Sequence, residues 1–172
     1  FTGHTFFNLA GDPTTLNTDY VMTVNADRYL PVDKNLTPTG EAAEVAGTPM
    51  DFRKAHALSQ TINDTSFEQI RNASGYDHNW CLNTYKDGKG DDTKVCAVLW
   101  SPLTKIGLSM YTNEPGVQVY TGNFQETGVS CKHGIKYPKH VSVCLESQKY
   151  PDSPNKHNWP SPYLKPGEKY YS

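Results

Sequence analysis

The sequence predicts an all-β protein built from antiparallel strands. Several short runs alternate apolar with polar residues, and clusters rich in Gly, Pro, Asn and Asp separate these runs. Alternation with a period of two is typical of strands that bury one face and leave the other in water. Helical patterning is scarce, so we expect one antiparallel unit, a sandwich or part of one.

Four runs carry the alternating pattern most clearly. They span residues 22–27, 106–111, 117–122 and 141–146. Residues 59–62 and 66–71 each have the composition for only a turn or two of helix. No internal repeat and no linker divides the chain, so residues 1–172 are predicted to belong to one domain.

The last of these runs places a carboxylate among polar neighbours. Apolar residues at 141, 143 and 145 share one face of the expected strand, while Cys144, Glu146 and Gln148 share the other. Glu146 beside Gln148 suits a cleft, but the pattern by itself favours an exposed glutamate on a solvated sheet face.

Composition excludes two classes of partner. The chain has 172 residues with 16 Lys and Arg against 18 Asp and Glu, for a net charge of −2. Without a basic excess, nucleic acid is not an expected partner. The longest apolar run, residues 95–100, is far shorter than the roughly 20 residues of a membrane span, so no membrane partner is expected.

The four cysteines leave two interpretations open. Cys81 and Cys96 flank the turn-like residues 87–91 at about equal distances, and Cys131 and Cys144 flank residues 137–138. If each pair lies on opposed strands, two disulfides can form. The alternative is four reduced thiols, as in cytosolic proteins. No C-x-x-C spacing is present, so structural zinc is not expected.

The compartment has only indirect signals. An even number of cysteines and three N-x-S/T sequons, at Asn35, Asn63 and Asn72, favour a secreted or lumenal glycoprotein, with a cytoplasmic location as the alternative. The first residues lack a Met and any signal-peptide pattern, so we expect a mature product or a fragment.

Several motifs occur in a characteristic order along the whole chain. They are His4–Gly11 (HTFFNLAG), Pro38–Gly40, Asp51–Arg53, Gly75–Asn79 (GYDHN), Glu114–Asn123 (EPGVQVYTGN), Cys144–Gln148 (CLESQ) and Tyr150–Asn155. Together they resemble the aldose 1-epimerase (galactose mutarotase) family. The resemblance implies a large antiparallel β-sandwich that holds a sugar in a cleft on its concave face.

The resemblance covers about the C-terminal half of a family member. The family's histidine motif lies mid-chain, but here it begins at His4. The missing half normally supplies further strands, an arginine and another histidine. We therefore expect the N-terminal half of the same domain as a partner, on a separate or adjoining segment, because a lone half would leave long sheet edges unpaired.

The resemblance also implies a mechanism and its residues. Glu146, by its place in LES, matches the general base, and His4 matches the general acid. Asp77 matches a carboxylate that holds sugar hydroxyls. Gln118 is a further substrate-binding candidate, because its amide, on the same strand face as Tyr120, can donate to or accept from a sugar hydroxyl. No cofactor and no metal is needed, since the reaction is proton transfer to and from a free hexose such as galactose or glucose. Taken without the motifs, His4 suits an exposed surface position and Asp77 a turn.

Some residues argue against a simple transfer of function. Gly3 and Phe6 stand where the family usually has Asn and Tyr, which leaves rate and substrate preference open. The alternative function is a carbohydrate-binding or structural protein with little turnover.

Asp77 and His78 are adjacent and point to opposite faces of a strand, so they are not expected to share a metal. Among the aromatic residues, Trp80, Tyr120 and Trp159 are expected to pack in the core rather than against sugar.

Overall fold

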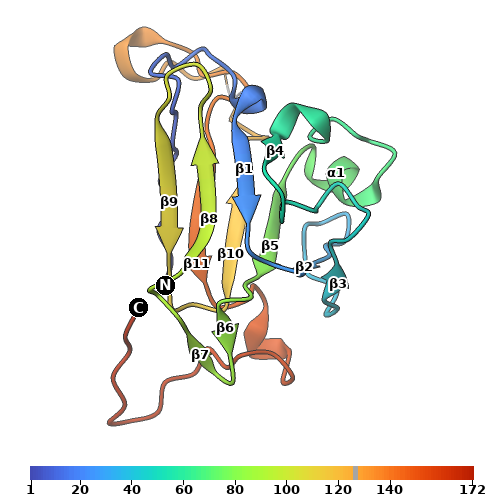
Figure 1. Ribbon diagram of the computed structural model, residues 1–172, viewed down its shortest axis with the longest axis vertical. Coiled ribbons are helices and arrows are strands. Elements are labelled where there is room, and N and C mark those ends of the chain that lie inside the picture. The colour runs from blue at the N-terminus through green and yellow to red at the C-terminus, as the bar shows by residue number, and fades with distance from the viewer. Residues whose placement is uncertain (126–127) are drawn as a thin grey trace.

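A computed structural model describes residues 1–125 and 128–172 as two antiparallel β-sheets stacked face to face (Figure 1). The first sheet contains, in spatial order, β4 (His56–Ala57), β1 (Val21–Val24), β8 (Val95–Trp100) and β9 (Gly107–Tyr111). The second contains β11 (Cys144–Gln148), β10 (Gly116–Tyr120), β5 (Asp77–Cys81), β2 (Arg28–Leu30) and β3 (Ala43–Glu44). The predicted all-β antiparallel fold is confirmed.

Helices are few and short. The α-helix α1 spans Glu68–Ala73, and the 3₁₀ turns are η1 (Asn17–Asp19), η2 (Leu58–Gln60), η3 (Lys132–Gly134) and η4 (Ser153–Asn155). The two stretches expected to supply a turn or two of helix coincide with η2 and α1. In the part of the chain that the structure describes, no helix is both long enough and apolar enough to cross a membrane.

The core lies between the two sheets. Met22 and Leu99 enter it from the first sheet, and Trp80, Val117 and Val119 enter it from the second. Each of these five side chains is fully buried. The Trp80 indole N–H donates to the carbonyl of Met50 at 3.0 Å, so its one polar group is satisfied inside the core. The expectation that Trp80 packs in the core is confirmed. The same expectation for Trp159 is wrong, because this side chain is only partly buried and packs against Tyr150 outside the core.

The last strand, β11, begins later in the chain than the alternating pattern predicts. β11 starts at Cys144, whereas the pattern began at residue 141. Before β11, Val143 pairs with Phe7 in an isolated bridge, in which each backbone N–H donates to the other residue's carbonyl at 2.9 Å. This bridge anchors the N-terminal segment alongside β11.

Of the two interpretations left open for the cysteines, the one with two disulfides is wrong, and all four cysteines are free. The turn itself was predicted correctly, because β6 (Tyr85–Lys86) and β7 (Lys89–Gly90) form a hairpin closed by residues 87 and 88. The hairpin ends before it reaches the cysteines, however. Cys81 lies in β5 of the second sheet and Cys96 in β8 of the first, so their strands are never paired.

The second cysteine pair fails for a related reason. Cys131 lies in the loop before η3, while Cys144 is buried at the start of β11 beside His4. Without disulfides, the prediction of a secreted or lumenal location depends on the sequons alone.

Candidate active site

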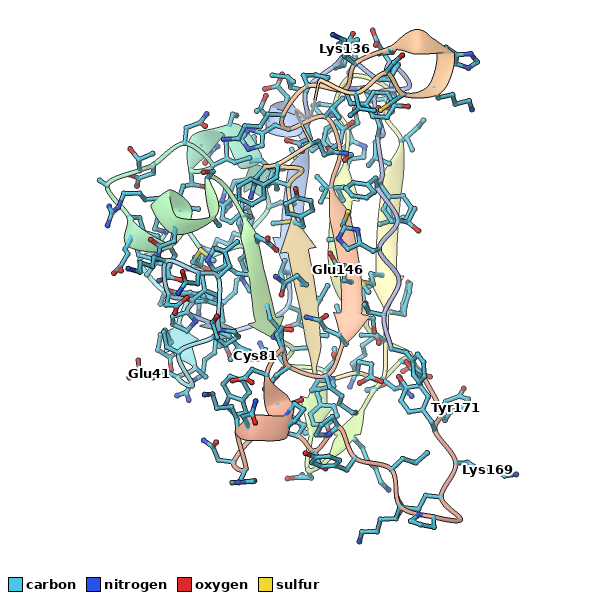
Figure 2. All side chains as sticks on the ribbon, turned by 180° about the vertical axis from the view of Figure 1, so that it is seen from behind. Glu41, Cys81, Lys136, Glu146, Lys169 and Tyr171 are labelled. Carbon is cyan, nitrogen blue, oxygen red and sulfur yellow. The ribbon has the colours of Figure 1, made fainter. Side chains whose placement is uncertain are left out.

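The outer face of the second sheet carries a row of polar side chains. In the register of the strands, Gln118 on β10 lies between Asn79 on β5 and Glu146 on β11. Directly opposed residues share one face of a sheet, so these three side chains all point away from the core. Figure 2 views the molecule from this side, with Glu146 labelled on β11 and Cys81 at the end of β5.

A second row lies one step along the same strands. Tyr120 is flanked by Asp77 on β5 and Cys144 on β11. His78, the neighbour of Asp77, faces the core instead and is fully buried. The prediction that Asp77 and His78 point to opposite faces is therefore confirmed.

Hydrogen bonds join the side chains of this face. The Gln118 amide N–H donates to Asp77 Oδ1 at 2.8 Å. Gln148, on the same face of β11, donates to Gln118 Oε1 and to Asn79 Oδ1, each at 3.3 Å. Gly116 has no side chain, which leaves space for the Asn79 amide above it. The network fixes the orientation of the Gln118 amide, so that its nitrogen faces the Asp77 carboxylate.

His4 reaches this face from the N-terminal segment. Its Nε2 lies 3.2 Å from Glu146 Oε1, and its Nδ1 lies 3.4 Å from Cys144 Sγ. The Glu146 side chain is only 9% exposed, whereas that of His4 is 48% exposed. The Phe7–Val143 bridge holds this segment three residues after His4. The buried carboxylate is therefore built into the sheet, and the histidine approaches it from the solvent side.

The surroundings of Glu146 favour the protonated form of its carboxyl group. Burial raises the pKa of this carboxyl above its usual range, His4 opposes that shift, and the negative charge of Asp77 adds to it. Burial also raises the pKa of Asp77, while the Gln118 hydrogen bond and the nearby His4 lower it. A carboxylate that is partly desolvated and close to a second carboxylate is a stronger base than one in water.

These side chains line one cavity of about 500 Å³. Its wall contains all four residues expected from the sequence, which are His4, Asp77, Gln118 and Glu146. The remaining lining residues are Phe6, Tyr120, Phe124, Gln148 and Pro151. The structure thus brings together residues that lie up to 147 positions apart in the chain.

Sequence reasoning missed part of the wall. Tyr120 was expected in the core, but it lines the cavity, and its hydroxyl accepts a hydrogen bond from the Phe124 N–H at 2.9 Å. Its place on β10, two residues from Gln118, was the available signal, because residues two apart share a strand face. Gln148 likewise lies two residues from Glu146 on β11, so its place on the cavity face could have been inferred in the same way.

One group at the site has the chemistry of a metal centre. His4, Cys144 and Glu146 each offer one ligand atom, and these atoms all lie within 4.8 Å of one another. The sequence did not predict this group, because His4 and Cys144 lie 140 residues apart.

Comparison with known proteins identifies the family. The family model described as aldose 1-epimerase matches residues 1–172. This chain belongs to the aldose 1-epimerase family. The human galactose mutarotase is 42% identical over 170 residues, which cover 98% of this chain and 46% of the human protein. The aldose 1-epimerase of Escherichia coli is 38% identical over 174 residues, covering 99% of this chain and 48% of that protein.

Solved structures of aldose epimerases agree with the fold. A homologue from C. elegans has a TM-score of 0.78 at 25% identity, covering 97% of this chain and 47% of that one. The galactose 1-epimerase of Lactobacillus acidophilus has a TM-score of 0.69 at 32% identity, with 87% and 40% covered. The chain therefore spans about half the length of the aldose 1-epimerases that it matches.

Proposed function

We propose that this chain carries the acid–base pair of a mutarotase that interconverts the α and β anomers of free hexoses such as galactose and glucose. The observation that carries the proposal is the contact of 3.2 Å between His4 Nε2 and Glu146 Oε1 in the wall of a sugar-sized cavity. Membership of the aldose 1-epimerase family supports the same reaction class.

The reaction needs two proton transfers at neighbouring oxygens of the sugar. Glu146 removes the proton of the C1 hydroxyl while protonated His4 donates a proton from Nε2 to the ring oxygen. The bond between C1 and the ring oxygen breaks, and C1 becomes an aldehyde. Rotation about the C1–C2 bond then presents the other face of C1, and both transfers run backwards to close the ring. Each transfer is typically worth 10²–10⁴-fold in rate.

The geometry of the acid–base pair suits this chemistry. The two oxygens that exchange protons are bonded to the same carbon, so the acid and the base must stand close together. His4 and Glu146 already contact each other, and the half-exposed histidine, which belongs to the N-terminal segment and not to the sheet, is the partner that moves aside when sugar enters. Because Glu146 is buried and its pKa raised, it is a stronger base than an exposed glutamate.

The rest of the wall suits a neutral, hydroxyl-rich ligand. Asp77 and the amides of Gln118 and Gln148 offer charged and neutral hydrogen-bonding groups to sugar hydroxyls. Within the described part of the chain, the cavity lining contains no Lys or Arg. Such a wall suits a ligand whose hydroxyls both donate and accept hydrogen bonds, as those of a free hexose do.

We further propose that residues 1–172 form the C-terminal part of one larger β-sandwich. The chain covers 46% of the human galactose mutarotase. β9 is an edge strand of the first sheet, and Tyr111 at its end is more than half exposed, as are Leu103 and Ile106 in the turn before it. Apolar side chains beside an open strand edge are suited to pairing with further strands, and those strands would close the sugar cavity. A sugar and this companion segment are thus the proposed partners.

Polarimetry of freshly dissolved α-D-galactose and α-D-glucose tests the function. The complete native protein is used, so that any companion segment is present. Faster decay of optical rotation than in buffer supports the proposal. Sugar binding by calorimetry without faster decay would instead identify a carbohydrate-binding protein, and folded protein that shows neither property refutes both functions.

A further inference from the structure

The proposed reaction gives no role to one buried nucleophilic group at the site, the thiol of Cys144. Cys144 lies in the same row as Asp77 and Tyr120, and its side chain is fully buried. Its sulfur is 3.4 Å from His4 Nδ1, on the opposite side of the imidazole from Glu146. Proton transfer to and from a sugar uses His4 and Glu146 but no thiol.

Together the three side chains form a donor set that suits zinc. An imidazole nitrogen, a thiolate sulfur and a carboxylate oxygen are all common zinc ligands, at about 2.0–2.3 Å from the ion. Two ligands of one tetrahedral ion then lie roughly 3.5 Å apart. The ligand atoms of His4, Cys144 and Glu146 lie within 4.8 Å of one another. A contraction of about an ångström, together with a turn of the His4 ring that aims one of its nitrogens at the ion, brings them to a common ion.

The structure also allows that contraction. Cys144 and Glu146 are two residues apart on one face of β11, so the sheet fixes two of the three ligands. The third, His4, is half-exposed and belongs to the segment held by the Phe7–Val143 bridge. A site with three protein ligands leaves the fourth position for water on the cavity side.

Charge favours a cation in this position. Glu146 and a Cys144 thiolate together balance the two positive charges of Zn²⁺, and the Asp77 carboxylate adds negative potential nearby. In the metal-free protein, burial and the charges of Glu146 and Asp77 raise the pKa of the Cys144 thiol to about 12. Zinc must therefore displace the thiol proton, which passes to the solvent.

We propose that Zn²⁺ binds to His4, Cys144 and Glu146 in competition with the sugar and thereby inhibits this enzyme. The inhibition rests on the proposed function, because the ion occupies both the acid and the base. The metal site itself does not, because it follows from the positions of three side chains. Zinc thus acts at this site as an inhibitor and has no part in turnover.

Spectroscopy with Co²⁺, a substitute for Zn²⁺, tests the site without any assay of activity. Titration of the complete metal-free protein should give a near-ultraviolet sulfur-to-cobalt charge-transfer band that saturates at one ion per chain, and Zn²⁺ should abolish it. In Cys144→Ala and Cys144→Ser the band should disappear. Cys81→Ala is the matched control, because Cys81 lies on the same sheet face but outside the group. It should keep the band.

Kinetics then tests the inhibition. Zn²⁺ should slow mutarotation, higher sugar concentration should relieve the inhibition, and a chelator should restore the rate. Relative to the metal-free rate of each variant, the inhibition constant should weaken by at least about tenfold in both Cys144 variants, since even losing an outer-shell partner of a metal typically costs that much.

Two results would overturn the inference. One is the absence of the band in the wild-type protein, and the other is zinc inhibition that is unchanged in folded Cys144→Ser. A charge-transfer band in a protein that does not accelerate mutarotation would uphold the metal site and refute the proposed function, so the two failures are distinguishable.

Discussion

Gln118 lies directly opposite Glu146 in the paired strands β10 and β11. The Gln118 amide donates to Asp77 at 2.8 Å, so one side chain stands between the proposed base and the proposed sugar-binding carboxylate. The two carboxylates therefore keep a fixed separation across β10. Both carboxylates face the cavity, and the negative charge of Asp77 raises the pKa of Glu146.

Loss of the Gln118 amide should weaken sugar binding more than it slows the chemistry. In Gln118→Ala, Asp77 loses its hydrogen-bond donor and is no longer held toward the cavity. A hydrogen bond to a charged group is worth about 1.5–3 kcal/mol, so KM should rise roughly tenfold or more while kcat changes less. Steady-state kinetics of the variant beside the exposed control Gln60→Ala provides the measurement. A fall in kcat at constant KM would contradict this role for Gln118.

Removing the Asp77 charge should lower the pKa of Glu146. Asp77 raises that pKa through its negative charge, so Asp77→Asn removes one cause of the upward shift. Carboxyl ¹³C NMR of Glu146 as a function of pH gives the value directly, without depending on turnover. Asp92→Asn, at an exposed position, should leave the titration unchanged. An unchanged Glu146 titration in Asp77→Asn would show that the two carboxylates are not coupled.

Replacing Glu146 by Gln should stabilise the fold near neutral pH even though it removes the base. The pKa of Glu146 in the folded protein lies above its ordinary value of 4.5. Between these two values the folded state binds more protons than the unfolded chain, so this carboxyl lowers stability increasingly as the pH rises through that range. Gln is neutral throughout and lacks this penalty.

Urea denaturation at several pH values measures the effect. The difference in unfolding free energy between Glu146→Gln and wild type should grow as the pH rises from about 4.5, and Glu41→Gln, at an exposed position, should show no such trend. A variant that becomes progressively less stable than wild type over this range would mean that the contact with His4 outweighs the cost of burial.

All four cysteines should titrate as thiols. After unfolding without reductant, a thiol reagent should detect four groups, and reduction should leave the intact mass unchanged. In the folded protein, the half-buried Cys81 and Cys131 should react before the buried Cys96 and Cys144. Two or fewer thiols in the unfolded protein would show that a disulfide does form.

The comparison of sequence and structure separates local from long-range information. The alternating runs predicted β1, β9 and β10, because burial of one face imposes a period of two on the residues themselves. The cysteine pairing failed, because equal distances from a turn do not reveal that the chain leaves the hairpin for two different sheets.

The residues of the site also divide into those that local motifs predicted and those whose contacts depend on the three-dimensional fold. His4, Asp77 and Glu146 were predicted from motifs that resemble the aldose 1-epimerases, and Gln118 from its place on the expected strand. The structure places all four around one cavity. The contact between His4 and Cys144 depends on how a segment at the start of the chain lies against β11 near its end. No periodicity or spacing in the sequence predicts that contact.

The most direct test of the account is the rate of anomer exchange in Glu146→Gln. Magnetisation transfer between the α and β anomeric NMR signals of glucose measures this rate at equilibrium, in the complete protein. Loss of a general base should slow the exchange that the enzyme catalyses by about 10²–10⁴-fold, while Glu41→Gln retains the wild-type rate. A folded Glu146→Gln protein that exchanges the anomers as fast as the wild type would contradict the central claim that Glu146 is the base.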